Sequence, residues 1–291
     1  MAELKDKYID PFTDFGFKKL FGEECNKDLL LDFLNELLYK KEGKIVSITY
    51  IKNDKPGRSE SDRKAVFDIH CENEKGEKFI VEIQKSKYNF RADRVSPIVE
   101  YAAQGNLNDE LKAVYIIAIL NYVFEEDKND DPNKYRYDVM LTNIIANEMF
   151  YDKLRFIRLV MPKFNKSVNE LETRFEKWMY VIKHLKRLNR FPKKLREKVF
   201  EKMFAAAEVA KLSNEEYDEY IEDLNSYRDL QNCIDTARRE GIAKGRKERA
   251  KGKAERNEQI ALKMLADGMS IEIVSKYTGL SVQQIEKLNI L

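Results

Sequence analysis

The stretch FDIHCENEKGEKFIVEIQK, residues 67–85, decides the fold because it specifies two antiparallel strands and the register between them. Two runs of alternating apolar and polar residues flank Glu74-Lys75-Gly76, which has the pattern of a three-residue turn with glycine at its left-handed position. Such a turn pairs Asn73 with Glu77, so residues whose numbers sum to 150 lie opposite each other. The sequence therefore predicts a hairpin with one fixed register.

Side chains alternate across a strand, so the predicted hairpin has an apolar face and a polar face. The apolar face carries Phe67, Ile69, Cys71, Phe79, Val81 and Ile83. On the other face Asp68 lies across from Glu82, with Cβ atoms about 5 Å apart, and Gln84 follows across from Val66. Two like charges this close destabilise a sheet unless something compensates them.

A divalent cation is the simplest compensation for the two carboxylates. Oxygen ligands without histidine or thiolate point to Mg²⁺ or Mn²⁺. The alternative is a solvent-exposed sheet face, on which Asp68 and Glu82 would be hydrated. The hairpin by itself leaves both interpretations open.

Composition excludes several classes of protein. The chain of 291 residues is 43% apolar and 36% charged, which is too apolar for disorder throughout. Its longest apolar run, 113–120, is too short to span a membrane, and the N-terminus has no apolar signal core. Three widely spaced cysteines and two histidines provide neither a disulfide framework nor a zinc site. We expect a cytoplasmic protein without a membrane partner.

The pattern of the chain predicts an α/β core followed by helices. In the first 165 residues we expect helices over 10–40, 90–107 and 137–147, and strands over 44–51, 65–71, 78–85, 113–120 and 154–160. Strands and helices in this order give a mixed sheet. Beyond it we expect helices over 171–188, 194–212, 215–228 and 231–265.

Positive charge is concentrated near the end of the chain. Residues 238–256 hold nine Lys or Arg against three Glu, while the remainder has 44 basic and 48 acidic residues. A basic segment on an acidic body predicts contact with a polyanion. A solvated helical linker is the alternative.

The last segment, SIEIVSKYTGLSVQQIEKL at 270–288, predicts a helix-turn-helix. Ser270 is placed to cap the first helix, and Ser281 with Gln284 forms a capping-box pattern for the second. The expected small core comprises Ile260, Leu262, Leu265, Ile271, Val274, Leu280, Ile285 and Leu288. The tail either contacts DNA or is a helical cap or dimer-forming module.

Several stretches together resemble the PD-(D/E)XK nuclease family transposases, also called recombination-promoting nucleases. They are DPFTDFGFKKLFG (10–22), DRKAVFDIHCENEKGEKFIVEIQ (62–84), RADRVSPIVEYAAQ (91–104) and AVYIIAIL (113–120). The resemblance implies a restriction-endonuclease-like αβββαβ core with a mixed central sheet and an all-helical C-terminal region. We expect a nuclease-like domain at 1–165, a helical extension at 166–237, a basic linker at 238–256 and the helix-turn-helix-like tail at 257–291.

The resemblance also implies roles for individual residues. Asp68 and Glu82 would hold Mg²⁺ or Mn²⁺ with the backbone carbonyl of Ile83. Gln84 stands where the superfamily usually has lysine, so it can orient a water but supplies no charge. Asp14 would complete the metal shell or orient a water, or else it is an N-cap or pairs with Lys18. The residues expected to contact DNA are Arg63, Lys64, Arg91 and Gln104.

The function expected from these residues is a Mg²⁺-dependent DNA endonuclease with low sequence specificity, associated with recombination or mobile elements. The alternative is a catalytically weak or inactive DNA-binding or regulatory protein on a nuclease fold. A third hypothesis is a partner-binding protein that dimerises through the helix spaced by Gly241, Gly245 and Gly252. We expect DNA as the partner and a homodimer as the assembly.

Overall fold

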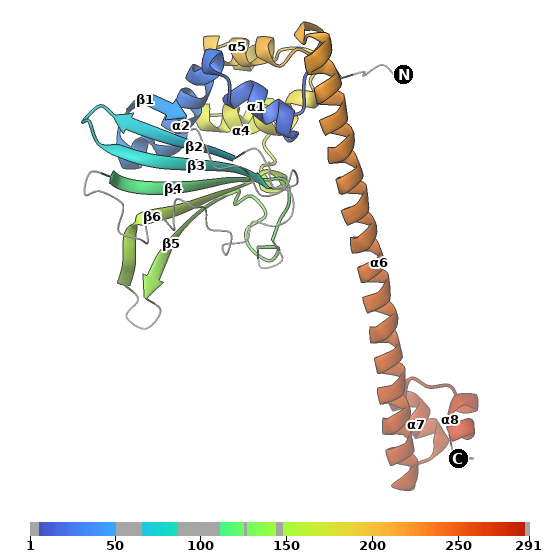
Figure 1. Cartoon of the computed structure of the whole chain (residues 1–291). Helices are drawn as coiled ribbons and strands as arrows, with labels where there is room; N and C mark the ends of the chain where they lie inside the picture. Colours follow the sequence, from blue (N-terminus) through green and yellow to red (C-terminus); the bar gives the residue numbers. More distant parts are fainter. Residues whose placement is uncertain (1–5, 51–65, 87–110, 125–126, 144–147, 289–291) are drawn as a thin grey trace, which may run out of the picture. The chain divides into compact units, whose positions relative to one another are not determined.

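A computed structural model describes residues 6–50, 66–86, 111–124, 127–143 and 148–288. The chain divides into two compact units, Met1–Leu224 and Asn225–Leu291. The first unit contains one six-stranded sheet with helices on it (Figure 1). No helix in the described part of the chain is both long and apolar enough to cross a membrane.

The sheet is mixed, as the sequence predicts. Its strands are β1 (Ile45–Tyr50), β2 (Val66–Asn73), β3 (Lys78–Ser86), β4 (Leu111–Leu120), β5 (Arg136–Asn143) and β6 (Glu148–Val160). The spatial order is β1-β2-β3-β4-β6-β5. Strands β3, β4 and β6 run parallel to one another, and the other neighbours are antiparallel. The fold class is therefore α/β with a mixed central sheet.

The hairpin of β2 and β3 has the predicted register. Asp68 pairs with Glu82 and Val66 with Gln84. The turn closes through a hydrogen bond from the Asn73 N–H to the Glu77 carbonyl of 3.1 Å. Gly76 has φ of 75°, the left-handed conformation that this turn requires and that glycine adopts without steric cost.

The buried Asn73 side chain fixes this turn from inside. Its Oδ1 accepts hydrogen bonds from the backbone N–H groups of Lys75 and Glu77, each 3.0 Å long. Its Nδ2 donates to the Glu42 carbonyl at 2.6 Å and to the Glu77 carboxylate at 2.7 Å. Asn73 is only 1% exposed. One side chain thus ties the turn to the end of a helix and helps to hold the hairpin in register.

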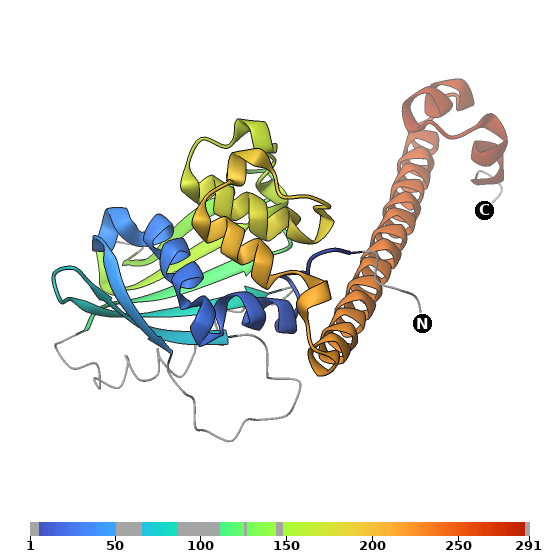
Figure 2. The ribbon, with the colours of Figure 1, turned by 90° about the horizontal axis from the view of Figure 1, so that it is seen from above.

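Helices cover one face of the sheet. They are α1 (Asp14–Phe21), α2 (Lys27–Glu42), α4 (Arg174–His184) and α5 (Lys198–Ala206), seen over the strands in Figure 2. On that face Ile69, Val81 and Tyr115 occupy paired positions of three neighbouring strands and are fully buried. They confirm the apolar face predicted for the hairpin, together with buried Cys71 and Phe79.

Trp178 of α4 lies at the centre of the helical layer and is completely buried. Its ring contacts Phe21, Phe33 and Phe200, with centroids 5.0–6.0 Å apart. Its indole N–H donates to the Asp32 carboxylate at 2.7 Å, and Arg174 binds the same carboxylate through two hydrogen bonds. An aromatic cluster and a shared carboxylate therefore join α1, α2, α4 and α5.

Residues 136–143 form a strand, so the helix predicted over 137–147 is wrong at 137–143, and 144–147 lie outside the described residues. This segment is β5, at the edge of the sheet and antiparallel to β6. Its Tyr137 is buried, whereas Val139 and Met140 are 42% and 43% exposed. Pairing with β6 overrides the helical spacing of its apolar residues. The helix predicted over 90–107 lies outside the described residues.

The second unit consists of the C-terminal part of α6 (Asn214–Ala266) with α7 (Ile271–Thr278) and α8 (Val282–Leu288). Gly279 ends α7 with φ of 71°, and Ser281 and Gln284 form the predicted capping box. The buried hydrophobic residues among the described part of this unit are Ala261, Val274, Leu280 and Ile285, against which Met264, Leu265, Ile271 and Leu288 pack.

The expectation that Ile260 and Leu262 belong to this small core is wrong. These two side chains are 40% and 45% exposed, and Ala261 between them is completely buried. A small residue lets α6 approach the following helices closely. Ser270 holds the N-cap position of α7 but makes no side-chain capping bond. Residues 238–256 lie within α6, and all are exposed except the partly buried Gly245.

Candidate active site

The acidic pair lies on the two antiparallel strands next to the parallel part of the sheet. Counting from the hydrogen-bonded pair Asn73–Glu77, the pair Asp68–Glu82 falls at a non-hydrogen-bonded position of the ladder. At such a position the two Cα atoms are about 4.5 Å apart, the closer of the two antiparallel arrangements. The backbone thus brings the two acidic residues as close as antiparallel strands allow.

The neighbours of the pair on this face of the sheet are exposed towards the edge and buried towards the centre. Towards the edge, His70 and Thr49 lie at exposed positions of the same face. Towards the centre, Glu82 is paired with Ile116 of β4, and Gln84 with Ala118. Ile116 is 2% exposed and Ala118 is completely buried. The pair therefore lies where an exposed sheet face becomes a covered one, which favours a site over a freely hydrated surface.

The donor set fits a hard divalent cation. Two adjacent carboxylates and a backbone carbonyl from the same hairpin are oxygen ligands of the kind that Mg²⁺ and Mn²⁺ bind. Among the described side chains, no group of three or more His, Cys, Asp or Glu is placed to hold a metal. The side chains of Asp68, Glu82, Ile83 and Gln84 lie outside the described part, so their metal contacts stay predictions.

Asp14 begins α1 and does not cap it. Thr13 is the N-cap: its Oγ1 accepts from the Gly16 N–H at 2.9 Å and donates to the Asp10 carbonyl at 2.8 Å. A Cβ on Gly16 would lie 2.1 Å from that carbonyl, so the tight start of α1 requires glycine. The alternative of Asp14 as N-cap is therefore wrong. In Figures 1 and 2, α1 lies towards the end of the sheet opposite the hairpin turn.

Sequence reasoning missed a polar network between β4, β6 and the end of α2, on the helix-covered face of the sheet. The Tyr115 hydroxyl donates to the Glu42 carboxylate, and Arg155 donates to that hydroxyl at 2.7 Å. Burial, followed by the hydrogen bond to Glu42, raises the pKa of Tyr115 well above its usual range. Glu42 is 2% exposed. The sequence signals of this network were Glu42, which ends a helix rich in apolar residues, and Tyr115, which lies within an apolar strand.

A second network braces the loop that follows β4. The buried Lys163 ammonium donates to the carbonyls of Asp127 and Asp131 at 2.6 and 3.2 Å, and to the Tyr137 hydroxyl at 2.8 Å. Arg158 pairs with the Asp127 carboxylate at 3.2 Å. These contacts anchor the loop beyond the carboxyl ends of the parallel strands. Arg63, Lys64, Arg91 and Gln104 lie outside the described residues.

The mixed sheet and the opposed acidic pair on adjacent strands define a nuclease-like α/β fold. Two family models match the chain: PD-(D/E)XK nuclease family transposase over residues 11–237, and the C-terminal helix-turn-helix domain of the Rpn/YhgA-like nuclease family over 255–290. The first covers well over half of the sequence, so the chain belongs to the PD-(D/E)XK nuclease family transposases. No curated protein and no solved structure matches it.

Proposed function

We propose that this protein hydrolyses phosphodiester bonds of DNA as a Mg²⁺- or Mn²⁺-dependent endonuclease of low sequence specificity, in recombination or mobile elements. The observation that carries the proposal is the pairing of Asp68 with Glu82 across β2 and β3 in a chain of a nuclease family. We assign the chemistry to residues 1–165, with 166–237 as a helical extension and 238–256 as a basic linker.

Each residue of the candidate site has a distinct task in this proposal. The carboxylates of Asp68 and Glu82 and the carbonyl of Ile83 would hold the cation. When bound, such an ion lowers the pKa of a water and stabilises negative charge on a phosphodiester. Gln84 orients the attacking water through its amide. Asp14 completes the oxygen shell or positions that water.

DNA contacts come from two places in the proposal. Arg63, Lys64, Arg91 and Gln104 bind the phosphates near the strand pair. The helix-turn-helix at 257–291 contributes a further contact, supported by the match of this segment to a C-terminal helix-turn-helix domain. We propose a homodimer as the working assembly, which sedimentation velocity tests directly.

Metal binding and cleavage are tested together on isosteric variants. We expect wild-type protein to bind Mn²⁺ in calorimetry and to nick supercoiled plasmid with Mg²⁺, and Asp68→Asn and Glu82→Gln to lose both properties. Glu72→Gln is the matched control, because Glu72 lies on the same strand and face as Asp68, opposite Lys78. Unchanged binding and nicking in Asp68→Asn would remove this residue from the site.

A second candidate function follows from Gln84, since an amide in place of lysine supplies no positive charge to the reacting phosphate. On this hypothesis the protein binds DNA and cleaves weakly or not at all. Gln84→Lys discriminates between the two: it should raise the cleavage rate of a weak enzyme at unchanged metal affinity. A protein inactive with every divalent ion, with or without Gln84→Lys, is a DNA-binding or regulatory protein.

A further inference from the structure

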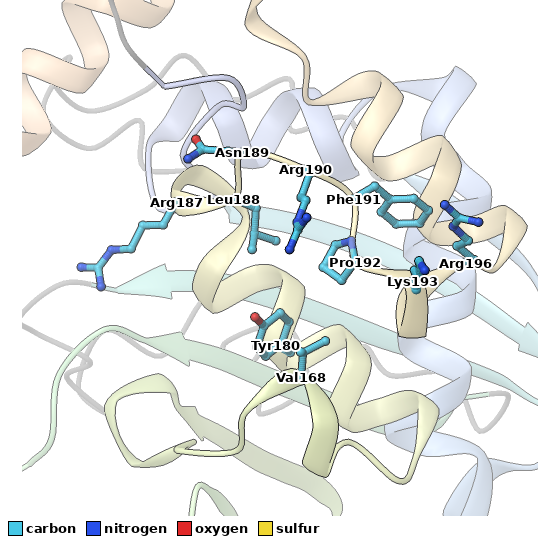
Figure 3. Close-up of a pocket in the computed structure, with 10 residues that line it drawn as sticks. All are labelled: Val168, Tyr180, Arg187, Leu188, Asn189, Arg190, Phe191, Pro192, Lys193 and Arg196. Atoms are coloured by element: carbon cyan, nitrogen blue, oxygen red, sulfur yellow. The ribbon is translucent and has the colours of Figure 1, made fainter.

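A basic pocket lies in the helical layer of the first unit, in the segment that joins α4 to α5. Its volume is about 990 Å³. The lining residues are Val168, Tyr180 and most of the stretch from Arg187 to Arg196 (Figure 3). None of them belongs to the candidate active site or to the two C-terminal DNA-binding segments predicted from sequence.

The charge of this segment is one-sided. From His184 to Arg196 there are six Lys or Arg and no Asp or Glu. Four of these cations line the pocket, namely Arg187, Arg190, Lys193 and Arg196, and no carboxylate is among the described residues that line it. In Figure 3 the Arg190 guanidinium points between Leu188 and Pro192 towards Tyr180.

Neighbouring carboxylates do not neutralise these four cations. Glu197 pairs with Lys177 at 2.5 Å and with Arg174 at 3.2 Å, and Asp10 pairs with Lys186 at 2.8 Å. Within the described part of the chain, the side chains of the four pocket cations have neither an ion pair nor a hydrogen bond. The pocket therefore presents concentrated positive charge that is free to bind an anion.

The floor of the pocket is apolar and aromatic. Val168, Tyr180, Leu188 and Pro192 line it and are all partly exposed. The Tyr180 ring lies 4.6 Å from the imidazole of His184, whose pKa falls to about 4 because of burial and the positive charges of Lys183 and Arg187. The Tyr180 ring that lines the pocket therefore rests on an imidazole that is uncharged at neutral pH, and it offers a flat aromatic face to a ligand.

We propose that this pocket binds single-stranded DNA, with phosphates on the cations and an unpaired base against the apolar floor. Cationic grooves with aromatic platforms bind single strands in this way, because every base has a flat face and every nucleotide a phosphate. A duplex keeps its bases stacked and paired, so it reaches the cations but not the floor. The inference rests on the proposed action on DNA and adds a strand-binding surface to it.

The test measures binding of a fluorescent oligo(dT) and of a duplex of equal length to the full-length protein in EDTA, where no cleavage occurs. In Arg190→Ala/Arg196→Ala we expect the negative slope of log K against log salt to become shallower by about 1.4. At 0.1 M salt this corresponds to roughly 25-fold weaker oligo(dT) binding. Tyr180→Leu should weaken oligo(dT) at least about fivefold and leave the duplex unchanged. Urea unfolding followed by Trp178 fluorescence checks that each variant is folded.

The matched control is Lys40→Ala/Lys75→Ala, which removes the same charge from two exposed lysines of the same unit outside the pocket. An equal loss of affinity in the control and the arginine variant would overturn the inference, as would an unchanged salt slope in the arginine variant. As an independent readout, bound oligo(dT) should raise the pKa of His184, followed by NMR, and the arginine variant should lose that shift.

Failure of the nuclease proposal has a different signature. A protein that binds oligo(dT) through Arg190 and Arg196 but never nicks plasmid supports the pocket and overturns the nuclease. A protein that nicks plasmid but binds oligo(dT) equally well with and without these arginines overturns the pocket and keeps the nuclease.

Discussion

Asn73→Ala should destabilise the first unit more than its small size suggests, because this side chain makes four hydrogen bonds from a buried position. The carbonyl of Glu42 loses its donor in the interior, which costs about 1–3 kcal/mol. The bond to the partly exposed Glu77 carboxylate adds about 1 kcal/mol, and water replaces the two turn bonds at a few tenths each. We expect a total loss of about 3 kcal/mol.

Urea unfolding followed by fluorescence measures this loss in the right part of the molecule. Trp178 is the only tryptophan of the chain and is buried in the first unit, so its emission reports that unit alone. With a urea slope of about 2–3 kcal/mol per molar, the midpoint should fall by about 1–1.5 M. The exposed Asn129 serves as control, because Asn129→Ala should stay within about 0.5 kcal/mol of wild type.

A second substitution separates the donor bonds of Asn73 from its acceptor bonds. Asn73→Asp keeps both acceptors for the turn but turns a carboxylate oxygen towards the Glu42 carbonyl and the Glu77 carboxylate. If the donor bonds dominate, Asn73→Asp is at least as destabilising as Asn73→Ala at pH 7. A midpoint for Asn73→Ala within about 0.3 M of wild type would refute the reasoning.

Three further predictions concern other parts of the chain. Asp32→Ala removes the hydrogen-bond acceptor of the buried Trp178 indole N–H and the ion-pair partner of Arg174. The urea midpoint should therefore fall by the equivalent of about 2–3 kcal/mol, and by less in Asp32→Asn. Burial and then two cations lower the pKa of His184 from 6.5 to about 4. As the pH drops through this range the unfolded chain binds a proton before the folded protein does, so the free energy of unfolding decreases. In His184→Gln the urea midpoint should therefore fall less between pH 7 and pH 5 than it does in wild type. Gly279→Ala places a side chain at φ of 71° and should cost the tail about 1 kcal/mol, seen as faster amide exchange in α8.

Local chemistry made the hairpin predictable. A three-residue turn ending in Gly76 fixes which residues face each other, and this information lies within nineteen consecutive residues. The register, the buried face and the opposition of Asp68 and Glu82 all follow from it. The tail was predictable for the same reason, since Gly279 and the Ser281–Gln284 capping box act within one turn of a helix.

Long-range contacts were beyond sequence reasoning. The apolar residues of strand β5 also fit helical spacing, and pairing with β6 across the sheet decides its conformation. The buried Glu42 and Lys163 have charged side chains that composition assigns to the surface, and only the fold supplies their partners. The basic pocket likewise escaped notice, because Arg187 to Arg196 forms a short irregular segment between helices rather than a periodic pattern.

The exposed stretch of α6, residues 238–256, determines where a protease can cleave the chain between its two folded units. Residues 238–256 bury almost no side chain, so backbone hydrogen bonds and local propensity alone keep them helical, and their three glycines weaken the helix by roughly 1 kcal/mol each relative to alanine. Opening this stretch exposes none of either core. Its nine Lys and Arg are trypsin sites, so brief digestion should cut the chain here first and release two folded fragments whose separate chemistry can then be assayed.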